Sequence, residues 1–181
     1  MKNKHLLRFF VCFLAFLLAL PVFDVFASVE NDVENMADKL LDCKVKELGY
    51  KNEQELIDGY LCDYAGVFSE WYIIALARHG KYDLSSYESA LLKYLGENKI
   101  TSATSRQKYA LALLAVGSSS DYVTKTVEDS IGEQGIMSYV FGLHMLNNAL
   151  ISTKFTKDEV ISKLLSLEID GGGWSLTGQN A

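Results

Sequence analysis

The sequence has a single proline, three cysteines and two tryptophans in 181 residues. The proline, Pro21, lies near the N-terminus, so the remainder of the chain lacks the residue that most strongly breaks helices. This favours long helices over a loop-rich architecture. Basic residues are also few, with 17 Lys and Arg against 23 Asp and Glu. Nucleic-acid binding is excluded as a function class, because phosphate contacts need clustered cations that this acidic chain does not offer.

The first residues are typical of an export signal. Three bases within the first eight residues precede an unbroken apolar run of 12 residues, Phe9 to Leu20. That run is shorter than the roughly 20 residues of a spanning helix, and a small-x-small pattern ends at Ala27. We therefore predict that residues 1–27 are a signal peptide, cleaved before Ser28, and that the protein is secreted or at the cell surface. An uncleaved anchor helix is the alternative.

Cleavage removes three bases and one acid, which leaves 14 Lys and Arg against 22 Asp and Glu in the mature chain. Two cysteines remain, Cys43 and Cys62. In an oxidising compartment they are a candidate disulfide, which would contribute about 3 kcal/mol by limiting the entropy of the unfolded chain. Two separate buried thiols are the equal alternative, because spacing alone does not fix geometry.

Helical periodicity recurs along the mature chain. A polar amphipathic helix is predicted over 31–48, ending at Gly49, and a short one within 50–66. Three densely apolar helices follow, over 69–79, 106–116 and 138–146. Each is followed by a more polar helix: one opened by a capping box at Ser85 and Glu88, one over 121–131, and one opened by a capping box at Thr156 and Glu159.

This alternation predicts three helical hairpins, each a buried helix followed by a half-exposed one. Gly80 and Gly117, which follow the first two buried helices, are 37 residues apart. Repeats of this length cannot bury their own apolar faces and must stack on neighbours. Such a stack forms either an open superhelix of the tetratricopeptide type or a closed ring. The ring is favoured, because its inner helices contact neighbours on all sides and so become apolar all round.

Three segments, "EWYIIALARHGKYDLSSY", "SRQKYALALLAVG" and "KLLSLEIDGGGWSLTG", resemble the prenyltransferase and squalene-oxidase repeat proteins. The resemblance covers roughly residues 68–181. It implies an all-α fold, the α/α toroid, and is nearest to exported proteins of Gram-positive bacteria that are related in fold to the cobalamin carriers transcobalamin and intrinsic factor. We therefore expect residues 28–66 to form an N-terminal helical segment. Residues 67–181 are expected to form toroid repeats of an incomplete ring.

The hallmark of that repeat is a Gln-x-x-Asp-Gly-Gly-Trp corner. The sequence offers Glu168, Ile169, Asp170, Gly171, Gly172, Gly173 and Trp174, with Glu in place of Gln and the Asp one position early. Glycine permits the positive φ angles of a tight turn, and a tryptophan can wedge between hairpins while its indole N–H finds a carbonyl. We interpret this motif as a structural corner.

Motifs for the chemistry of this family are absent from the sequence. It lacks the Asp-x-Asp-Asp acid of squalene cyclases, the Asp-Asp-x-x-Asp diphosphate site, and a close set of zinc ligands. Ser130 to Gln134 imitates the thioester motif of complement-like domains, but Ile131 occupies the position of its cysteine. The glycines near the C-terminus are not followed by the Lys-Ser or Lys-Thr of a phosphate-binding loop.

The sequence therefore predicts an exported, non-catalytic module for ligand binding or cell-surface interaction, without catalytic residues, metal or obligate cofactor. The most specific ligand that the resemblance implies is a cobalamin-like corrinoid. Candidate ligand-binding residues are the aromatic and polar members of the inner helices: Trp71, Tyr72, Tyr109, His144 and Asn147. The expected partners are a small molecule or an envelope component, and further C-terminal repeats of the same chain. One alternative is the N-terminal part of a terpene-cyclase-type enzyme with its motifs beyond residue 181, and another is a structural surface scaffold.

Overall fold

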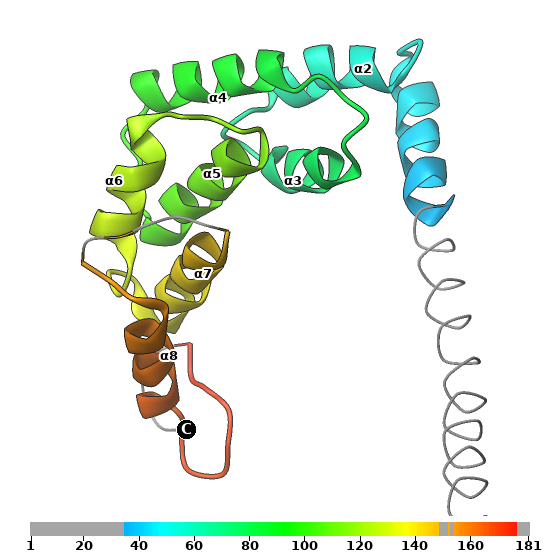
Figure 1. Ribbon diagram of the computed structural model, residues 1–181. Helices are drawn as coiled ribbons and strands as arrows, with labels where there is room; N and C mark the ends of the chain where they lie inside the picture. The colour runs from blue at the N-terminus through cyan, green and yellow to red at the C-terminus, as the bar shows by residue number, and fades with distance from the viewer. Residues whose placement is uncertain (1–34, 149–151, 153, 177–181) are drawn as a thin grey trace, which may run out of the picture. The chain divides into compact units, whose positions relative to one another are not determined.

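The computed structural model describes residues 35–148, 152 and 154–176 (Figure 1). Every regular element among these residues is a helix, which confirms the predicted all-α class. The chain divides into two compact units between Glu53 and Gln54. The predicted signal peptide, residues 1–27, lies outside the described residues.

In the first unit the described residues form one helix over 35–48. It ends where predicted, because Gly49 adopts a φ of 77° and Tyr50 N–H turns back to the carbonyl of Val45 at 3.0 Å. Its surface carries the ion pair Lys44–Glu47 at 2.8 Å. As an exposed pair one helical turn apart, it contributes a few tenths of a kcal/mol at most, about 0.2–0.5.

The second unit begins within α2. Its elements are α2 (Glu53–Leu56), the π-helical segment η1 (Ile57–Leu61), α3 (Glu70–His79), α4 (Ser85–Glu97), α5 (Ala103–Ala115), α6 (Asp121–Ser130), α7 (Gly135–Asn147) and α8 (Lys157–Ser166). Residues 54–66 belong to the same compact unit as the helices from α3 to α8, because Leu56, Ile57 and Leu61 are buried there and α4 packs on η1. The division into an N-terminal segment over 28–66 and toroid repeats over 67–181 stays a prediction.

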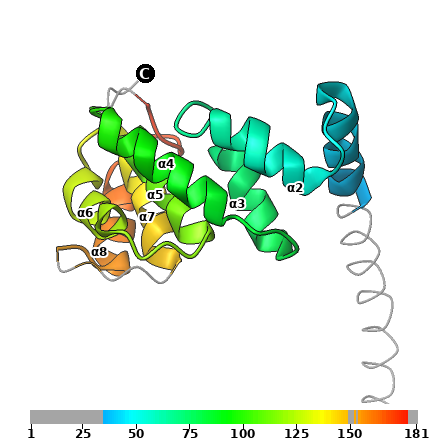
Figure 2. The ribbon, with the colours of Figure 1, turned by 90° about the horizontal axis from the view of Figure 1, so that it is seen from above.

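The helices of the second unit lie in two layers, as Figures 1 and 2 show. The three densely apolar helices pack side by side, with α5 between α3 and α7. The more polar helices lie against them: α4 on η1 and α5, α6 on α5 and α7, and α8 on α7. Tyr87 of α4 links the two helices of the first hairpin, because its hydroxyl lies 3.0 Å from Ser69 Oγ at the start of α3. Closure of these hairpins into a ring remains a prediction.

Positions 37 residues apart in α3 and α5 are structurally equivalent. Three pairs carry the correspondence, and every member is at most 4 % exposed: Glu70 with Gln107, Ile73 with Ala110, and Leu76 with Leu113. A second cluster fills the space between α6, α7 and α8, around Val127, Met145 and Val160. One repeated pattern therefore builds successive inner helices in the same orientation.

The helix ends show which capping predictions hold. Gly80 caps α3 with a φ of 71°, and Thr156 and Glu159 form the predicted capping box of α8. The capping box predicted at Ser85 and Glu88 is wrong, because α4 already includes Ser85. Asp83 takes that role, since its carboxylate accepts the Ser85 N–H at 3.0 Å, a bond that lowers the pKa of Asp83.

Two inner helices begin earlier than predicted. Helix α5 starts at Ala103 rather than Arg106, because the Ser102 hydroxyl accepts the Ser105 N–H and caps the additional turn. Helix α7 starts at Gly135 rather than Ser138. The Ser138 hydroxyl instead accepts N–H groups of Gly132 and Gln134, both at 3.1 Å, and so closes the preceding turn.

Candidate functional site

A cleft of about 370 Å³ opens on the three inner helices. Its aromatic and polar lining comes from the first and third of them: Trp71 and Arg78 of α3, Phe141 and His144 of α7, and Asn148 just after α7. Aliphatic side chains complete the floor: Ile74, Ala77, Leu111, Leu114 and Ala115. The cleft therefore combines an apolar floor with a few polar groups, as small-molecule sites do.

Helical spacing brings these residues to one face. In α3 the lining residues Trp71, Ile74 and Arg78 are separated by three and then four positions. In α7 the same spacing recurs seventy residues later, at Phe141, His144 and Asn148. Side chains separated by three and four residues share one helix surface, so each inner helix presents one stripe to the cleft.

The aromatic side chains approach one another across the gap between α3 and α7. The ring centroids of Trp71 and Phe141 are 6.1 Å apart, and those of Phe141 and His144 are 6.5 Å apart. Trp71 is 51 % exposed, so its indole presents a wide surface to the solvent-filled cleft. These rings can stack on a flat or apolar molecule, because aromatic faces prefer offset and tilted contacts at such separations.

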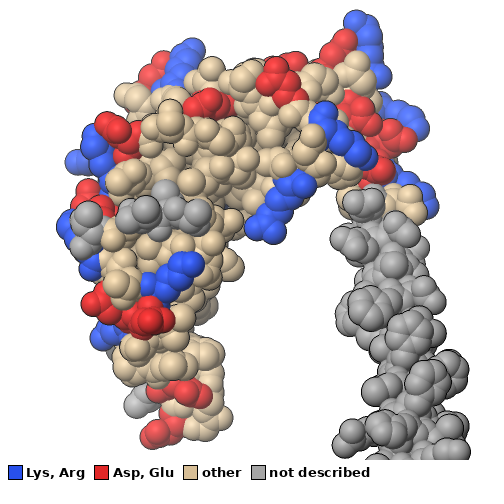
Figure 3. Space-filling model, viewed as in Figure 1, with Lys and Arg blue, Asp and Glu red and all other residues tan. Residues whose placement is uncertain are grey.

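The electrostatic character of the cleft differs from that of the chain as a whole. No Asp or Glu is among the described residues that line it, although the chain is acidic. Its one formal charge is the guanidinium of Arg78, in the last turn of α3. In Figure 3 basic and acidic side chains alternate along the outer edge, whereas the inner side is mostly uncharged apart from a few basic groups. Asn148 donates its side-chain amide to the His144 carbonyl at 2.7 Å, which fixes this rim.

The five predicted ligand-binding residues separate into three groups. Trp71 and His144 line the cleft together. Tyr72 and Asn147 are exposed but point elsewhere, and neither lines the cleft. Tyr109 is only 6 % exposed, and its hydroxyl donates to the Gly66 carbonyl at 2.7 Å, so it is a buried structural residue. Sequence reasoning missed Arg78, Phe141 and Asn148, for which the three-and-four spacing was the available signal.

Buried polar side chains join the N-terminal end of α3 to the middle of α5. The carboxylate of Glu70, which is fully buried, accepts the Gly66 N–H at 2.6 Å and pairs with Lys108 Nζ at 2.8 Å. The ammonium of Lys108 also lies 4.8 Å from the centre of the Tyr109 ring. Burial raises the pKa of the Tyr109 phenol above its ordinary value. This group is enclosed by protein and fixes the two helices rather than facing the cleft.

The glycine-rich corner adopts the conformation that its sequence predicts. Gly171, Gly172 and Gly173 have φ angles of 93°, 95° and 84°, which other residues rarely adopt. The turn is closed by the Ile169 N–H bonding the Gly173 carbonyl at 3.0 Å, and the indole N–H of Trp174 donates to the Leu164 carbonyl at 2.7 Å. Trp174 is 48 % exposed and Glu168 is also exposed. The wedge between hairpins remains a prediction.

Both cysteines of the described residues are free thiols. Cys43 is exposed, whereas Cys62 is partly buried, with its Sγ 3.7 Å from Ser86 Oγ. Burial raises the pKa of the Cys62 thiol, so the thiolate needed for disulfide exchange is disfavoured there. The disulfide remains a prediction that mass spectrometry of the unreduced protein tests.

Comparison with protein-family models, with curated proteins and with solved structures found no match for this chain. Within the described ranges, no three His, Cys, Asp or Glu residues gather as metal ligands would. The helices in those same ranges include none with the length and apolar character needed to cross a membrane.

Proposed function

We propose that this chain is an exported, non-catalytic toroid module that binds a small organic ligand in the cleft on its inner helices. The observation that supports this proposal best is the convergence of Trp71, Phe141 and His144, from helices seventy residues apart, on one cleft. An apolar floor with a few polar groups at its edge suits a ligand that is largely apolar or aromatic.

The size of the cleft limits how such a ligand would lie. A volume of about 370 Å³ is at the lower end of the range of small-molecule pockets, about 300–1,000 Å³. A corrinoid, the ligand that the family resemblance implies, is larger than the cleft. It would place one edge of its macrocycle against Trp71 and Phe141 and leave the rest outside.

Calorimetric titration of the exported protein with cobalamin tests the corrinoid assignment. We expect a saturable heat, and its absence at high micromolar ligand would eliminate this ligand class. The chain would be produced with its own N-terminal segment in a secreting bacterial host, and mass spectrometry of its N-terminus would test cleavage before Ser28 at the same time.

Two matched tryptophan variants locate the site. Trp71→Ala removes the ring on the cleft and should weaken binding about tenfold, since stacking on one aromatic side chain is worth 1–2 kcal/mol, approximately. Trp174→Ala removes the other tryptophan, outside the cleft, and should leave affinity unchanged. Equal weakening by both variants would show that the ligand does not bind in this cleft.

A further inference from the structure

The cleft on the inner helices has an aromatic end and a basic end. On α3 the lining residues run from Trp71 to Arg78, and on α7 and its cap they run from Phe141 to Asn148. The two ends of each stripe are separated by seven positions, which is about 10 Å along the axis at a rise of roughly 1.5 Å per residue. The aromatic and basic groups are therefore two subsites that one elongated molecule can contact together.

The two stripes run in the same direction, because each hairpin returns the chain to the side from which its inner helix started. The ring of Trp71, in the first turn of α3, lies 6.1 Å from that of Phe141, in the middle of α7. Arg78 lies in the last turn of α3, and Asn148 is the C-cap of α7. The guanidinium and the side-chain amide therefore share the end of the cleft opposite to the two rings.

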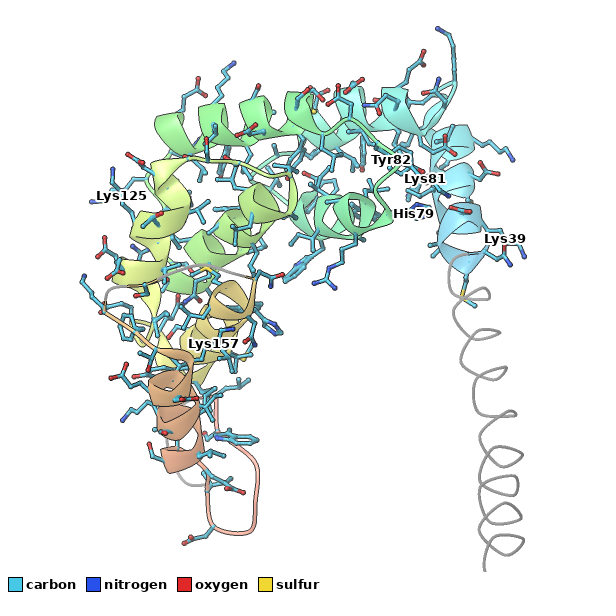
Figure 4. All side chains as sticks on the ribbon, viewed as in Figure 1. Lys39, His79, Lys81, Tyr82, Lys125 and Lys157 are labelled. Carbon is cyan, nitrogen blue, oxygen red and sulfur yellow. The ribbon has the colours of Figure 1, made fainter. Side chains whose placement is uncertain are left out.

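Arg78 gives this end of the cleft its charge. Among the described residues, its guanidinium has no hydrogen-bond or ion-pair partner. The next basic residues, His79 and Lys81, differ in this, since their side-chain nitrogens lie 3.3 Å apart at the end of α3 (Figure 4) and neither residue lines the cleft. A guanidinium on a cleft without acidic side chains attracts an anion, and its fork of N–H groups matches a carboxylate.

The helix ends on this side of the cleft do not cancel that attraction. The C-terminal carbonyls of a helix carry a partial negative charge, about half an elementary charge. However, the outer helix of a hairpin begins where the inner helix ends: α4 starts six residues after the end of α3, and α6 starts six residues after the end of α5. The positive N-termini of the outer helices offset these carbonyls, so the full charge of Arg78 decides the sign of the ligand.

We propose that the ligand of this cleft is an amphiphilic organic acid, with a flat apolar body against Trp71 and Phe141 and one carboxylate on Arg78. The inference rests on the proposed function, because it names the ligand class of the same site. Asn148 donates the second N–H of its amide to the carboxylate, since the first bonds the His144 carbonyl. One guanidinium balances one carboxylate, whereas a diphosphate carries more charge than this cleft can neutralise.

Two fluorescent probes that differ only in one terminal group test the inference. 1-Pyrenebutyrate carries a flat apolar body and a carboxylate on a short flexible arm, and 1-pyrenebutanol carries the same body and arm with a neutral alcohol. Titrations of the exported chain are followed by pyrene emission. We expect the butyrate to bind about tenfold more tightly, because charge-assisted hydrogen bonds to a guanidinium are stronger than neutral ones.

Variants of the basic end assign that preference to one residue. Arg78→Gln should weaken binding of the butyrate about tenfold and leave the butanol unchanged, whereas Arg78→Lys, which keeps the charge but loses the fork, should fall between. Lys125→Gln removes one positive charge from the outer side of α6 (Figure 4), so this matched control should bind both probes as the unaltered chain does. Circular dichroism checks that each variant is folded.

Trp71→Ala separates the carboxylate assignment from the proposed function. It should weaken both probes about tenfold, because both lose the same aromatic contact. If it does so while the unaltered chain shows no preference for the butyrate, or while Arg78→Gln affects both probes equally, the cleft remains a small-molecule site and the carboxylate assignment is overturned. If neither probe binds, or if Trp71→Ala changes neither affinity, the proposed site and this inference both fail.

Discussion

Helices α3 and α5 carry one pattern twice, and their different surroundings give equivalent residues different roles. Helix α5 packs on inner helices at both sides, whereas α3 packs closely on α5 alone among the inner helices described. The equivalent fully buried position is Glu70, the first residue of α3, and Gln107, in the second turn of α5. Glu70 pairs with Lys108, and Gln107 donates to the Ser138 carbonyl at 2.7 Å. What the position requires is a hydrogen-bonding group directed at the next helix, while its charge depends on the partner.

We expect the largest effect from breaking the buried ion pair between Glu70 of α3 and Lys108 of α5, because the equivalent Gln107 makes no such pair. Lys108→Met leaves the fully buried Glu70 carboxylate without a counter-charge and should lower the free energy of unfolding by about 3 kcal/mol. Urea denaturation followed by circular dichroism measures it. The double variant Glu70→Gln with Lys108→Met reproduces the neutral arrangement of α5 and should recover most of the loss. Additive losses in the double variant would contradict this account.

The glycine of the turn before α3 should be the next most sensitive position. A Cβ added to Gly66 would lie 2.1 Å from the Tyr94 ring, at a φ of +84°. Gly66→Ala should therefore cost about 2–3 kcal/mol, from overpacking and backbone strain together. Gly80, the C-cap of α3, has a φ of +71° in open space, so Gly80→Ala should cost only about 1 kcal/mol. Thermal unfolding of the Gly66→Ala and Gly80→Ala variants measures both losses of stability. Equal losses would show that the Tyr94 ring moves aside freely.

Tyr72 of α3 and Tyr109 of α5 are 37 residues apart, so their variants compare equivalent positions of the two helices directly. Tyr109→Phe leaves the Gly66 carbonyl without its buried donor and should cost about 1–2 kcal/mol, whereas Tyr72→Phe in dilute protein should cost nothing measurable. Denaturant titrations of both variants at low protein concentration would measure the difference. Comparable losses would mean that Tyr72 already has a buried partner in the single chain.

Alkaline pH gives the Tyr109 prediction a second readout. Burial raises the pKa of Tyr109 in the folded protein, while an unfolded tyrosine titrates near pH 10, approximately. The stabilising contribution of the neutral phenol is therefore complete below about pH 10 and is lost as the pH rises above it. With Tyr109→Phe, the free energy of unfolding should fall less steeply as the pH rises through that range. An unchanged slope would contradict the role of this phenol.

The smallest expected effect compares the outer helices of the first and last hairpins. Thr156→Ala removes the N-cap of α8 and should cost about 1 kcal/mol, whereas Ser85→Ala in α4, where no capping box forms, should change stability by less than about 0.5 kcal/mol. The backbone N–H and the hydroxyl of Thr156 both donate to the Glu159 carboxylate and lower its pKa. The part of the Thr156 effect that comes from its hydroxyl bond to this carboxylate should be present near neutral pH and lost as the pH falls through that lowered value, whereas the N-cap bond to the Glu159 N–H should persist. Chemical denaturation near pH 7 and near pH 3 measures both.

Much of the fold could be predicted from residues close in sequence. The apolar runs of α3, α5 and α7 predicted three inner helices, Gly80 and Gly117 predicted two of their ends, and the Thr156 capping box predicted the start of α8. These features depend on interactions within a few residues, which sequence spacing expresses. The capping box at Ser85 failed because Asp83, two residues earlier, offered a better acceptor for the same N–H.

The candidate site could be predicted only in part. Trp71 and His144, named from residue type, line the cleft, whereas Arg78 and Asn148 were not named because their place in its lining depends on α3 and α7 lying across one cleft. Asn147 and Asn148 are chemically identical neighbours, and only the rotation of α7 decides which of them lines the cleft. A sequence contains both candidates and lacks the neighbouring helix that selects between them.

The sequence by itself determined the helical class, the hairpin repeat and the positive φ angles of Gly171 to Gly173, because periodicity, capping chemistry and glycine's conformational freedom act locally. The tertiary structure alone decided that Tyr109 is enclosed while Tyr72 faces solvent, although both occupy one position of the repeat. Burial is a property of what packs on a residue, and in a repeat protein that depends on which hairpin lies beside it.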